Sequence, residues 1–230
     1  PSVVNGFDEN AVEAALRLKD KDPGSKITVI SVGKSFSMDV LKKPLSMGAD
    51  ELILVQDDLF DNTVDSYAVA TALVAAIKKI GKFDLVICGR QASDWHNAQV
   101  PHGVAELLNL PCITLGKKVE VASGKVTVER QLPDGIEIVE APLPAVVTVS
   151  NELGQPRYPT LRGIMAATRK APTIWKLGDL GIDASQISPR IRLLDLFVPV
   201  KAKQCEIIKG ENEADSGRLL ALKLREAKVI

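Results

Sequence analysis

The chain has 230 residues, of which 46% are hydrophobic and 25% are charged, as in an ordinary globular protein. Its 29 Lys and Arg residues balance 29 Asp and Glu residues. A net charge of zero argues against a nucleic-acid binder driven by phosphate neutralisation and against a polybasic membrane-surface protein. The three cysteines and two histidines show no disulfide or metal-site spacing. We therefore expect a reducing compartment, the cytoplasm, or the mitochondrial matrix in a eukaryote.

The first half of the chain alternates helical and strand patterns. Hydrophobic periodicity predicts helices over residues 8–19, 38–47, 63–80 and 99–108. Short apolar runs predict buried strands over residues 27–32, 51–55, 84–88 and 112–115. Glu13, Arg17 and Lys19 are expected on the polar side of the first helix, and Asp61, Asn62 and Thr63 are the expected caps of the third helix. Because this order begins with a helix, we expect that an N-terminal strand is missing from the numbering.

In the second half of the chain, apolar and polar residues alternate with the two-residue period of a β-strand. Turn signals separate three alternating segments, which predict an antiparallel excursion over residues 119–121, 125–130 and 136–140. A buried strand over residues 145–149 is expected to return to the main sheet. The sequence therefore predicts an α/β fold over residues 1–168, with a mostly parallel sheet that helices cover on both faces.

The C-terminal part is less regular. A short helix is expected over residues 161–168 and a terminal helix over residues 213–228. Residues 169–200 are apolar but lack periodicity, so residues 169–230 are expected to form an extended arm and a helix that pack on a partner subunit. The alternative is that the arm folds back on its own domain.

One polar loop stands where an open parallel sheet binds its ligands. Residues 89–100 follow a buried strand and lead into a helix, whose first N–H groups can hold a phosphate. From the residues alone, Asp94 or Asn97 is an alternative cap for that helix. The chain has no P-loop, no GxGxxG fingerprint and no nucleophilic or acid–base set, and Cys88 is expected to be inert. The residues thus indicate a binder of a phosphate-bearing ligand without catalytic or metal-binding residues.

Several separated motifs resemble those of one family. Residues 89–100 (GRQASDWHNAQV) resemble the nucleotide-binding loop of the electron-transfer flavoprotein β subunit, and residues 5–19 (NGFDENAVEAALRLK) are similar to that family's opening. Three further motifs follow in the family's order and spacing: LPAVVTV (143–149), QPRYPTLRGIMAA (155–167) and GDLGID (178–183). The resemblance covers nearly the whole chain and implies a doubly wound, mostly parallel α/β domain of the adenine-nucleotide-binding type over residues 1–168.

The resemblance implies an electron carrier rather than an enzyme. In this family an α subunit holds most of a FAD, and the heterodimer carries electrons between a donor and acyl-CoA-dehydrogenase-type or quinone-reductase partners. The β subunit binds a second nucleotide, which is AMP in housekeeping members and another FAD in electron-bifurcating members. Residues 98–100 look closer to the bifurcating members, whereas Trp95 and Pro101 depart from the pattern. The alternative outside the family is a stand-alone adenine-nucleotide-binding module.

The resemblance also implies site residues. The cofactor contacts would be Asn5, Gly6, Phe7, Asp8, Val32, Gly89, Arg90, Gln91, Ser93, Asp94, Asn97, Ala98, Gln99 and Val100. The partner contacts would be Tyr158, Leu161, Ile164 and Met165, with Leu161 as the anchor. From the residues alone, a buried core contact or a hydrophobic staple at the helix start is the favoured interpretation of Leu161, and only the resemblance favours the anchor.

Overall fold

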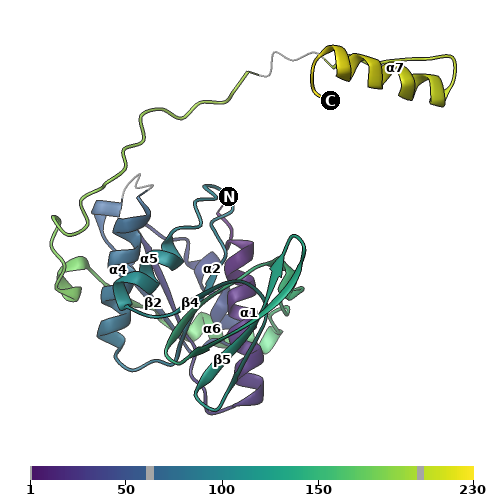
Figure 1. Ribbon diagram of the computed structural model, residues 1–230. Helices are drawn as coiled ribbons and strands as arrows, with labels where there is room; N and C mark the ends of the chain where they lie inside the picture. The colour runs from purple at the N-terminus through teal and green to yellow at the C-terminus, as the bar shows by residue number, and fades with distance from the viewer. Residues whose placement is uncertain (1, 61–64, 201–204) are drawn as a thin grey trace. The chain divides into compact units, whose positions relative to one another are not determined.

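The computed structural model describes residues 2–60, 65–200 and 205–230, and the chain divides into two compact units, Pro1–Arg192 and Leu193–Ile230. In the first unit, strands are flanked by helices (Figure 1). The predicted α/β fold with mostly parallel strands is confirmed. Among the described residues, no helix combines the length and the apolar surface that crossing a bilayer requires.

The first unit contains two hydrogen-bonded sheets rather than the single sheet expected. The smaller sheet has the order β1-β2-β8, with all strands parallel: β1 (Thr28–Gly33), β2 (Glu51–Gln56) and β8 (Thr173–Trp175). The larger sheet has the order β3-β7-β4-β5-β6: β3 (Leu85–Gly89), β7 (Ala145–Val149), β4 (Cys112–Ala122), β5 (Lys125–Leu132) and β6 (Gly135–Pro142).

The larger sheet joins a parallel part to an antiparallel part. β7 pairs in parallel with β3 on one side and with β4 on the other, whereas β4, β5 and β6 pair antiparallel. The predicted excursion and the return of residues 145–149 are therefore confirmed. The segments expected as two strands over 112–115 and 119–121 are one strand, which carries an irregularity between Gly116 and Lys118.

Most helices begin and end close to their predicted limits, but the single helix expected over residues 38–47 is divided into two short helices at Lys42. The helices are α1 (Gly6–Lys21), α2 (Met38–Leu41), α3 (Lys43–Met47), α4 (Ser66–Ile80), α5 (Val100–Leu108) and α6 (Leu161–Arg169), with 3-10 turns at η1 (Asp58–Phe60), η2 (Asn151–Leu153) and η3 (Leu177–Leu180). Asp65 caps α4 by accepting a hydrogen bond from the Tyr67 N–H at 2.8 Å. The expected caps Asp61, Asn62 and Thr63 lie outside the described residues.

Strand β7, between β3 and β4 in the larger sheet, is covered on both faces. Successive side chains of a strand point to opposite faces. Ala145, Val147 and Val149 pack in one cluster with Ala11 and Ala14 of α1. Val146 packs in another cluster, with α4 and α5. Every residue of β7 is buried. The strand therefore has α1 on one face and α4 and α5 on the other, as in a doubly wound fold.

The expected arm begins later than residue 169. Residues 173–175 form β8 and pair with β2. Leu177, Ile182 and Ile187 are buried in a cluster with Phe60 and α4. The boundary between the units follows Arg192 rather than residue 168. The alternative that the arm folds back on its own domain therefore describes residues 173–187. A three-residue strand is too short to show periodicity in the sequence, which explains the difference.

The second unit contains the terminal helix α7 (Glu213–Glu226). Asn212 caps it by accepting a hydrogen bond from the Asp215 N–H at 2.9 Å. No residue of α7 is buried, although the helix carries Leu219, Leu220, Leu222 and Leu224. The predicted terminal helix is thus present, and none of the described residues of its unit, 193–200 and 205–230, is buried.

Candidate functional site

The first turn of α1 meets the carboxyl end of β3. Asn5 donates through Nδ2 to the Gln91 carbonyl at 2.8 Å, and its Oδ1 accepts from the Ser93 hydroxyl at 2.5 Å. Asp8 accepts from the Gly89 N–H at 2.9 Å and from Asn5 Nδ2 at 2.8 Å. The structure therefore brings together five of the residues implied as cofactor contacts, from two segments that are far apart in the sequence.

Only glycine fits at position 89, where α1 and β3 touch. A Cβ on Gly89 would lie 2.6 Å from Asp8 Oδ1 and 2.6 Å from the carbonyl carbon of Phe7. Gly6 is exposed, with no atom within 4 Å of the place of its Cβ, and Phe7 is partly buried. A missing side chain at the strand end thus allows the helix start to approach closely.

The carboxylate of Asp8 turns toward this junction although the residue as a whole is exposed. Burial of the carboxylate raises the pKa of Asp8 above its ordinary value of 3.8, against the lowering effect of the hydrogen bonds from Asn5 and Gly89. Burial, together with the nearby charge of Asp8, raises the pKa of the Cys88 thiol to about 12. Cys88 therefore stays protonated, as expected of an inert thiol.

The remainder of the loop faces solvent. The Arg90 N–H donates to the Val149 carbonyl at 2.8 Å, which fixes the loop to the end of β7, and the Arg90 residue is exposed. Asp94 accepts from the N–H of the next residue, Trp95, at 2.9 Å. The N-cap position of α5 belongs to Gln99, whose side chain makes no capping hydrogen bond. Capping of α5 by Asp94 or Asn97 is therefore not observed among the described residues.

The end of the loop presents polar groups beside the start of α5. Ala98 has a left-handed backbone, with φ of 54°, and Val100 is the first residue of α5. Within the described part of the chain, the side chains of Asn97 and Gln99 have no hydrogen-bond partner. Together with the Arg90 guanidinium and the unpaired N–H groups of a helix start, this set of donors fits a phosphate-bearing nucleotide.

Val32 lies apart from this hydrogen-bonded set. It stands near the end of β1, which belongs to the smaller sheet. Its side chain packs against the cluster that contains Val55, Phe60 and Leu177. Of the implied cofactor contacts, Val32 is thus the one that the structure places in a different sheet.

The four implied partner contacts form an exposed apolar face at the start of α6. We call Tyr158, Leu161, Ile164 and Met165 the apolar face. Tyr158 is 90% exposed and Leu161 is 76% exposed, and Ile164 and Met165 are about half exposed. Large side chains at such exposure do not serve the core, so the alternative of Leu161 as a buried core contact is excluded.

The helix that carries the apolar face is firmly seated. The Thr160 hydroxyl caps α6 by accepting from the Gly163 N–H at 3.0 Å. A Cβ on Gly163 would lie 2.3 Å from the Ser46 carbonyl oxygen, so glycine allows α6 to lie directly on α3. Ala167 is buried in the cluster beneath. The sequence shows the cap, but it does not show the close approach at Gly163.

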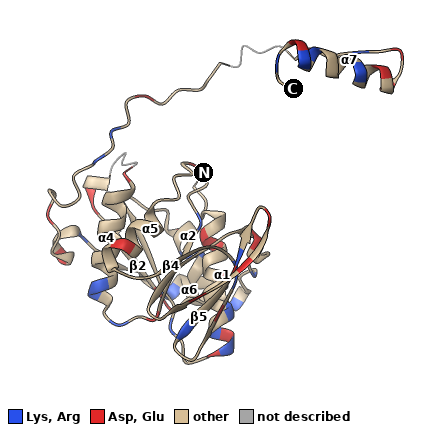
Figure 2. Ribbon diagram, in the orientation of Figure 1, with Lys and Arg blue, Asp and Glu red and all other residues tan. Residues whose placement is uncertain are grey.

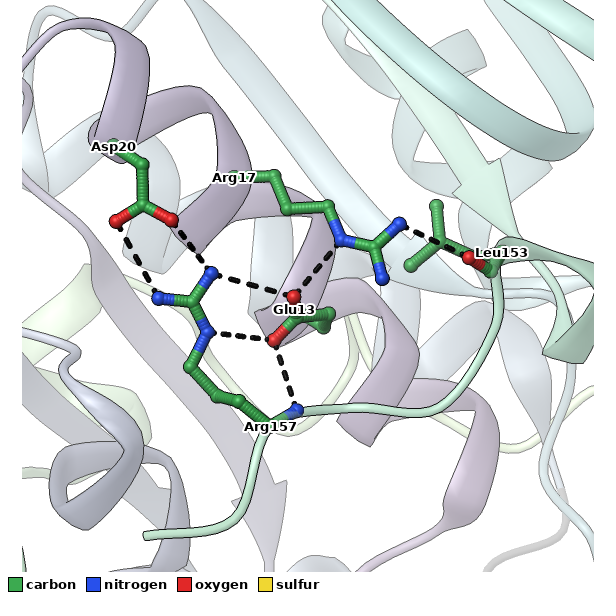
Figure 3. Close-up of polar contacts among 5 residues, drawn as sticks. All are labelled: Glu13, Arg17, Asp20, Leu153 and Arg157. Atoms are coloured by element: carbon green, nitrogen blue, oxygen red, sulfur yellow. Dashed lines mark hydrogen bonds and ion pairs between the residues drawn. The ribbon is translucent and has the colours of Figure 1, made fainter. Parts of the chain in front are cut away.

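A charged cluster links α1 to the segment before α6 (Figure 3). Only 6% of the Glu13 side chain is exposed, and its carboxylate accepts from Arg17 Nε at 2.9 Å and from Arg157 Nε at 2.8 Å. Arg157 also donates to Asp20 at 2.7 Å. Glu13 therefore shares the polar side of α1 with Arg17, as expected, but Arg157 covers it and it is buried rather than solvated. The sequence holds no signal for this cluster, because Glu13 and Arg157 are 144 positions apart.

A cavity of about 380 Å³ lies beside this cluster, between α1, η2 and the antiparallel strands, and Arg17 and Leu153 help to line it. Figure 2 shows both signs of charge interspersed over α1 and these strands. Among the lining residues, Lys21 pairs with Glu120 at 2.9 Å, and Lys118 pairs with Glu129 at 3.1 Å. Two of the three lining lysines are thus paired, and Glu120 and Glu129 place negative charge in the same cavity, so the loop of residues 89–100 is the better candidate for a phosphate site.

Comparisons with known proteins agree on one family. The family model described as "Electron transfer flavoprotein domain" matches residues 1–180. A protein named "Caffeyl-CoA reductase-Etf complex subunit CarD", from Acetobacterium woodii, is 37% identical, with 100% of this chain and 88% of that protein covered. The electron transfer flavoprotein β subunit of Thermoanaerobacterium thermosaccharolyticum is 43% identical (81% and 71% covered), and that of Bacillus subtilis is 35% identical (99% and 88% covered).

These matches span most of the chain and include the α1–β3 junction, the loop before α5 and the apolar face. The chain therefore belongs to the electron transfer flavoprotein β-subunit family.

Proposed function

We propose that the chain pairs with an α subunit and, through a FAD shared with it, carries electrons between a donor and an acyl-CoA-dehydrogenase-type or quinone-reductase partner. Membership of the family implies electron transfer with a flavin and an α subunit, rather than catalysis. We infer FAD and AMP as the cofactors, a flavoenzyme as the partner and the cytoplasm as the location of the chain. The three cysteines, none of which forms a disulfide, support a reducing compartment.

In this proposal, residues 5–8 and 89–100 hold AMP or a second FAD. The observation that carries it is the hydrogen-bonded junction of Asn5 and Asp8 with Gly89, Gln91 and Ser93, directly before the start of α5. Arg90 and the first N–H groups of α5 would hold the phosphates. The exposed polar side chains of Asp94, Asn97 and Gln99 would hold the remainder of the nucleotide. This second nucleotide would supply redox chemistry of its own if it is FAD, whereas AMP would not.

The apolar face would dock the partner flavoenzyme, with Leu161 as its anchor. Its exposure supports this role, because well-packed anchors in a partner's pocket carry much of the binding free energy of an interface. The relative CarD is named as a subunit of a complex with caffeyl-CoA reductase, which favours a CoA-linked flavoenzyme as the partner. Residues 193–230, with α7, would pack on the α subunit, since α7 buries no residue within its own unit.

The decisive test is to count the nucleotides in the complex of this chain with its α subunit. FAD and AMP are extracted from the purified complex and quantified per heterodimer. We expect a yellow complex with one FAD, plus either one AMP or a second FAD. A colourless homodimer that binds ATP would support the stand-alone nucleotide-binding module instead.

The double variant Asp94→Ala with Gln99→Ala locates the second nucleotide. Each lost polar contact costs on the order of 1–3 kcal/mol, so we expect the second nucleotide to be lost while the shared FAD is retained. Asp134→Ala, in the exposed turn between β5 and β6, is the control and keeps both nucleotides. Unchanged nucleotide content in the double variant would contradict the assignment of this loop.

A further inference from the structure

Arg157 lies one residue before the apolar face, and α1 holds it by both its main chain and its side chain. Glu13 Oε2 accepts from the Arg157 N–H at 3.1 Å and from Nε at 2.8 Å, and Glu13 Oε1 accepts from Nη2 at 3.3 Å. Asp20, two turns farther along α1, accepts from Nη2 at 2.7 Å. A planar guanidinium can hold two carboxylates at once, and this geometry requires arginine.

The segment that leads to Arg157 is tied to α1 at its other end as well. Arg17 Nη1 donates to the Leu153 carbonyl at 3.0 Å, while Arg17 Nε donates to Glu13. Glu13 thus accepts hydrogen bonds from both arginines (Figure 3). Residues 153–157 are therefore fixed on α1 at both ends.

The electrostatics favour the charged form of this cluster. Burial alone raises the pKa of Glu13, but the hydrogen bonds from Arg157 and Arg17 and the charge of Arg157 outweigh it and hold the pKa below 4.5. The hydrogen bonds to Asp20 and Glu13 raise the pKa of Arg157. Glu13, Asp20 and Arg157, which we call the clamp, are therefore fully ionised at neutral pH.

The other side of the apolar face is equally well fixed. Gly163 rests on the Ser46 carbonyl, and Thr160 caps α6. Only residues 158–160 lie between Arg157 and α6. A short segment held at both ends loses little conformational freedom when a partner binds it.

We propose that Arg157, held by Glu13 and Asp20, is a positioning residue that presents the apolar face in its docking conformation; this inference rests on the docking role in the proposed function. Only 6% of the Glu13 side chain is exposed, so Glu13 cannot itself contact a partner, whereas the side chains of Arg157 and Asp20 are 34% and 59% exposed. Any effect of Glu13 on docking must therefore act through the two arginines that it holds, Arg157 and Arg17.

The test uses the full complex with the α subunit and a short-chain acyl-CoA dehydrogenase as the probe partner. For Glu13→Gln and Arg157→Ala, we expect hydrogen exchange of residues 154–162 to accelerate roughly tenfold and the KM for the carrier to rise by a similar factor. The kcat and the flavin content stay unchanged. Arg157→Lys keeps the charge but cannot hold both carboxylates, so it restores only part of the wild-type KM.

Two control variants separate the possible outcomes. Lys21→Ala removes another ion pair of α1, with Glu120, and is expected to change neither the exchange nor the KM. Leu161→Ala tests the docking face itself. If it raises the KM while Glu13→Gln and Arg157→Ala do not, the positioning role is overturned and the docking role stands. If Leu161→Ala leaves the KM unchanged, the docking role fails and the inference fails with it; unchanged exchange in the clamp variants would also overturn it.

Discussion

Replacing Leu161 by alanine should weaken docking and barely affect the free energy of unfolding. Leu161 is 76% exposed, so only about a quarter of its side chain is covered in the chain itself. Burying a whole leucine side chain is worth about 1.5–3 kcal/mol, so the folded state loses roughly 0.5 kcal/mol. For a protein of this size, that loss lowers the Tm by about 1–2 °C.

The larger effect of Leu161→Ala is expected on the encounter with the partner. The exposed three quarters of the side chain is worth roughly 1–2 kcal/mol if it is buried in a partner's pocket. Since 1.4 kcal/mol is a factor of ten, the KM for the carrier should rise roughly 5- to 30-fold. The assay measures electron transfer from an acyl-CoA dehydrogenase at varied carrier concentration, with kcat and flavin content recorded in parallel.

Two leucines serve as references for this prediction. Leu54 of β2 is fully buried, and Leu54→Ala should cost about 2–5 kcal/mol of stability. Leu107 of α5 is partly exposed and lies outside the apolar face, so Leu107→Ala should leave the KM unchanged. A Tm loss for Leu161→Ala as large as that of Leu54→Ala, or an unaltered KM, would refute the reasoning.

Three further predictions concern the support of the site. In Gly163→Ala, the new Cβ meets the Ser46 carbonyl at 2.3 Å, so we expect a loss of about 1–3 kcal/mol in a denaturant titration; Gly178→Ala, with open space around it, should be neutral, and equal stability of the two variants would contradict the contact. The pKa of Glu13 is lowered on folding, so its stabilising effect is present above pH 4.5 and is lost as the pH falls through the folded pKa. The Tm difference between wild type and Glu13→Gln should therefore be largest at neutral pH and shrink in acid, and a difference that grows in acid would show that the sign is wrong. Cys88, with a pKa of about 12, should resist alkylation at pH 8 until the protein is unfolded, as followed by mass spectrometry, and rapid labelling of the native protein would argue against the raised pKa.

Local patterns were sufficient for most of the helices and strands. The apolar run of residues 145–149 predicts a buried strand, and β7 is indeed buried throughout its length. The cap residue Thr160 predicts the start of α6. The motif of residues 89–100 led to the loop that meets the start of α1. In each case, the signal lies within a few consecutive residues.

The features that the sequence did not reveal depend on contacts between distant residues. β8 has three residues and exists only through its pairing with β2. Glu13 looks like a solvated helix residue until Arg157 is placed beside it. The need for glycine at positions 89 and 163 follows from a neighbouring backbone that no local pattern describes. The division into two sheets likewise reflects which strand edges meet, and not the identity of the strands.

Helix α1 takes part in both regions of the candidate site, and this has a consequence for mutational work. Asp8 contacts the end of β3, and Glu13, on the same helix, holds Arg157. Five residues of α-helix separate the two by about 7.5 Å along the axis, a distance set by backbone hydrogen bonds and not by side-chain choice. A substitution that shifts α1 as a whole, such as a larger residue at Ala11 or Ala14 in the core, displaces both ends together. Defects in nucleotide retention and in docking would then occur in the same variant without any direct contact between the two sites.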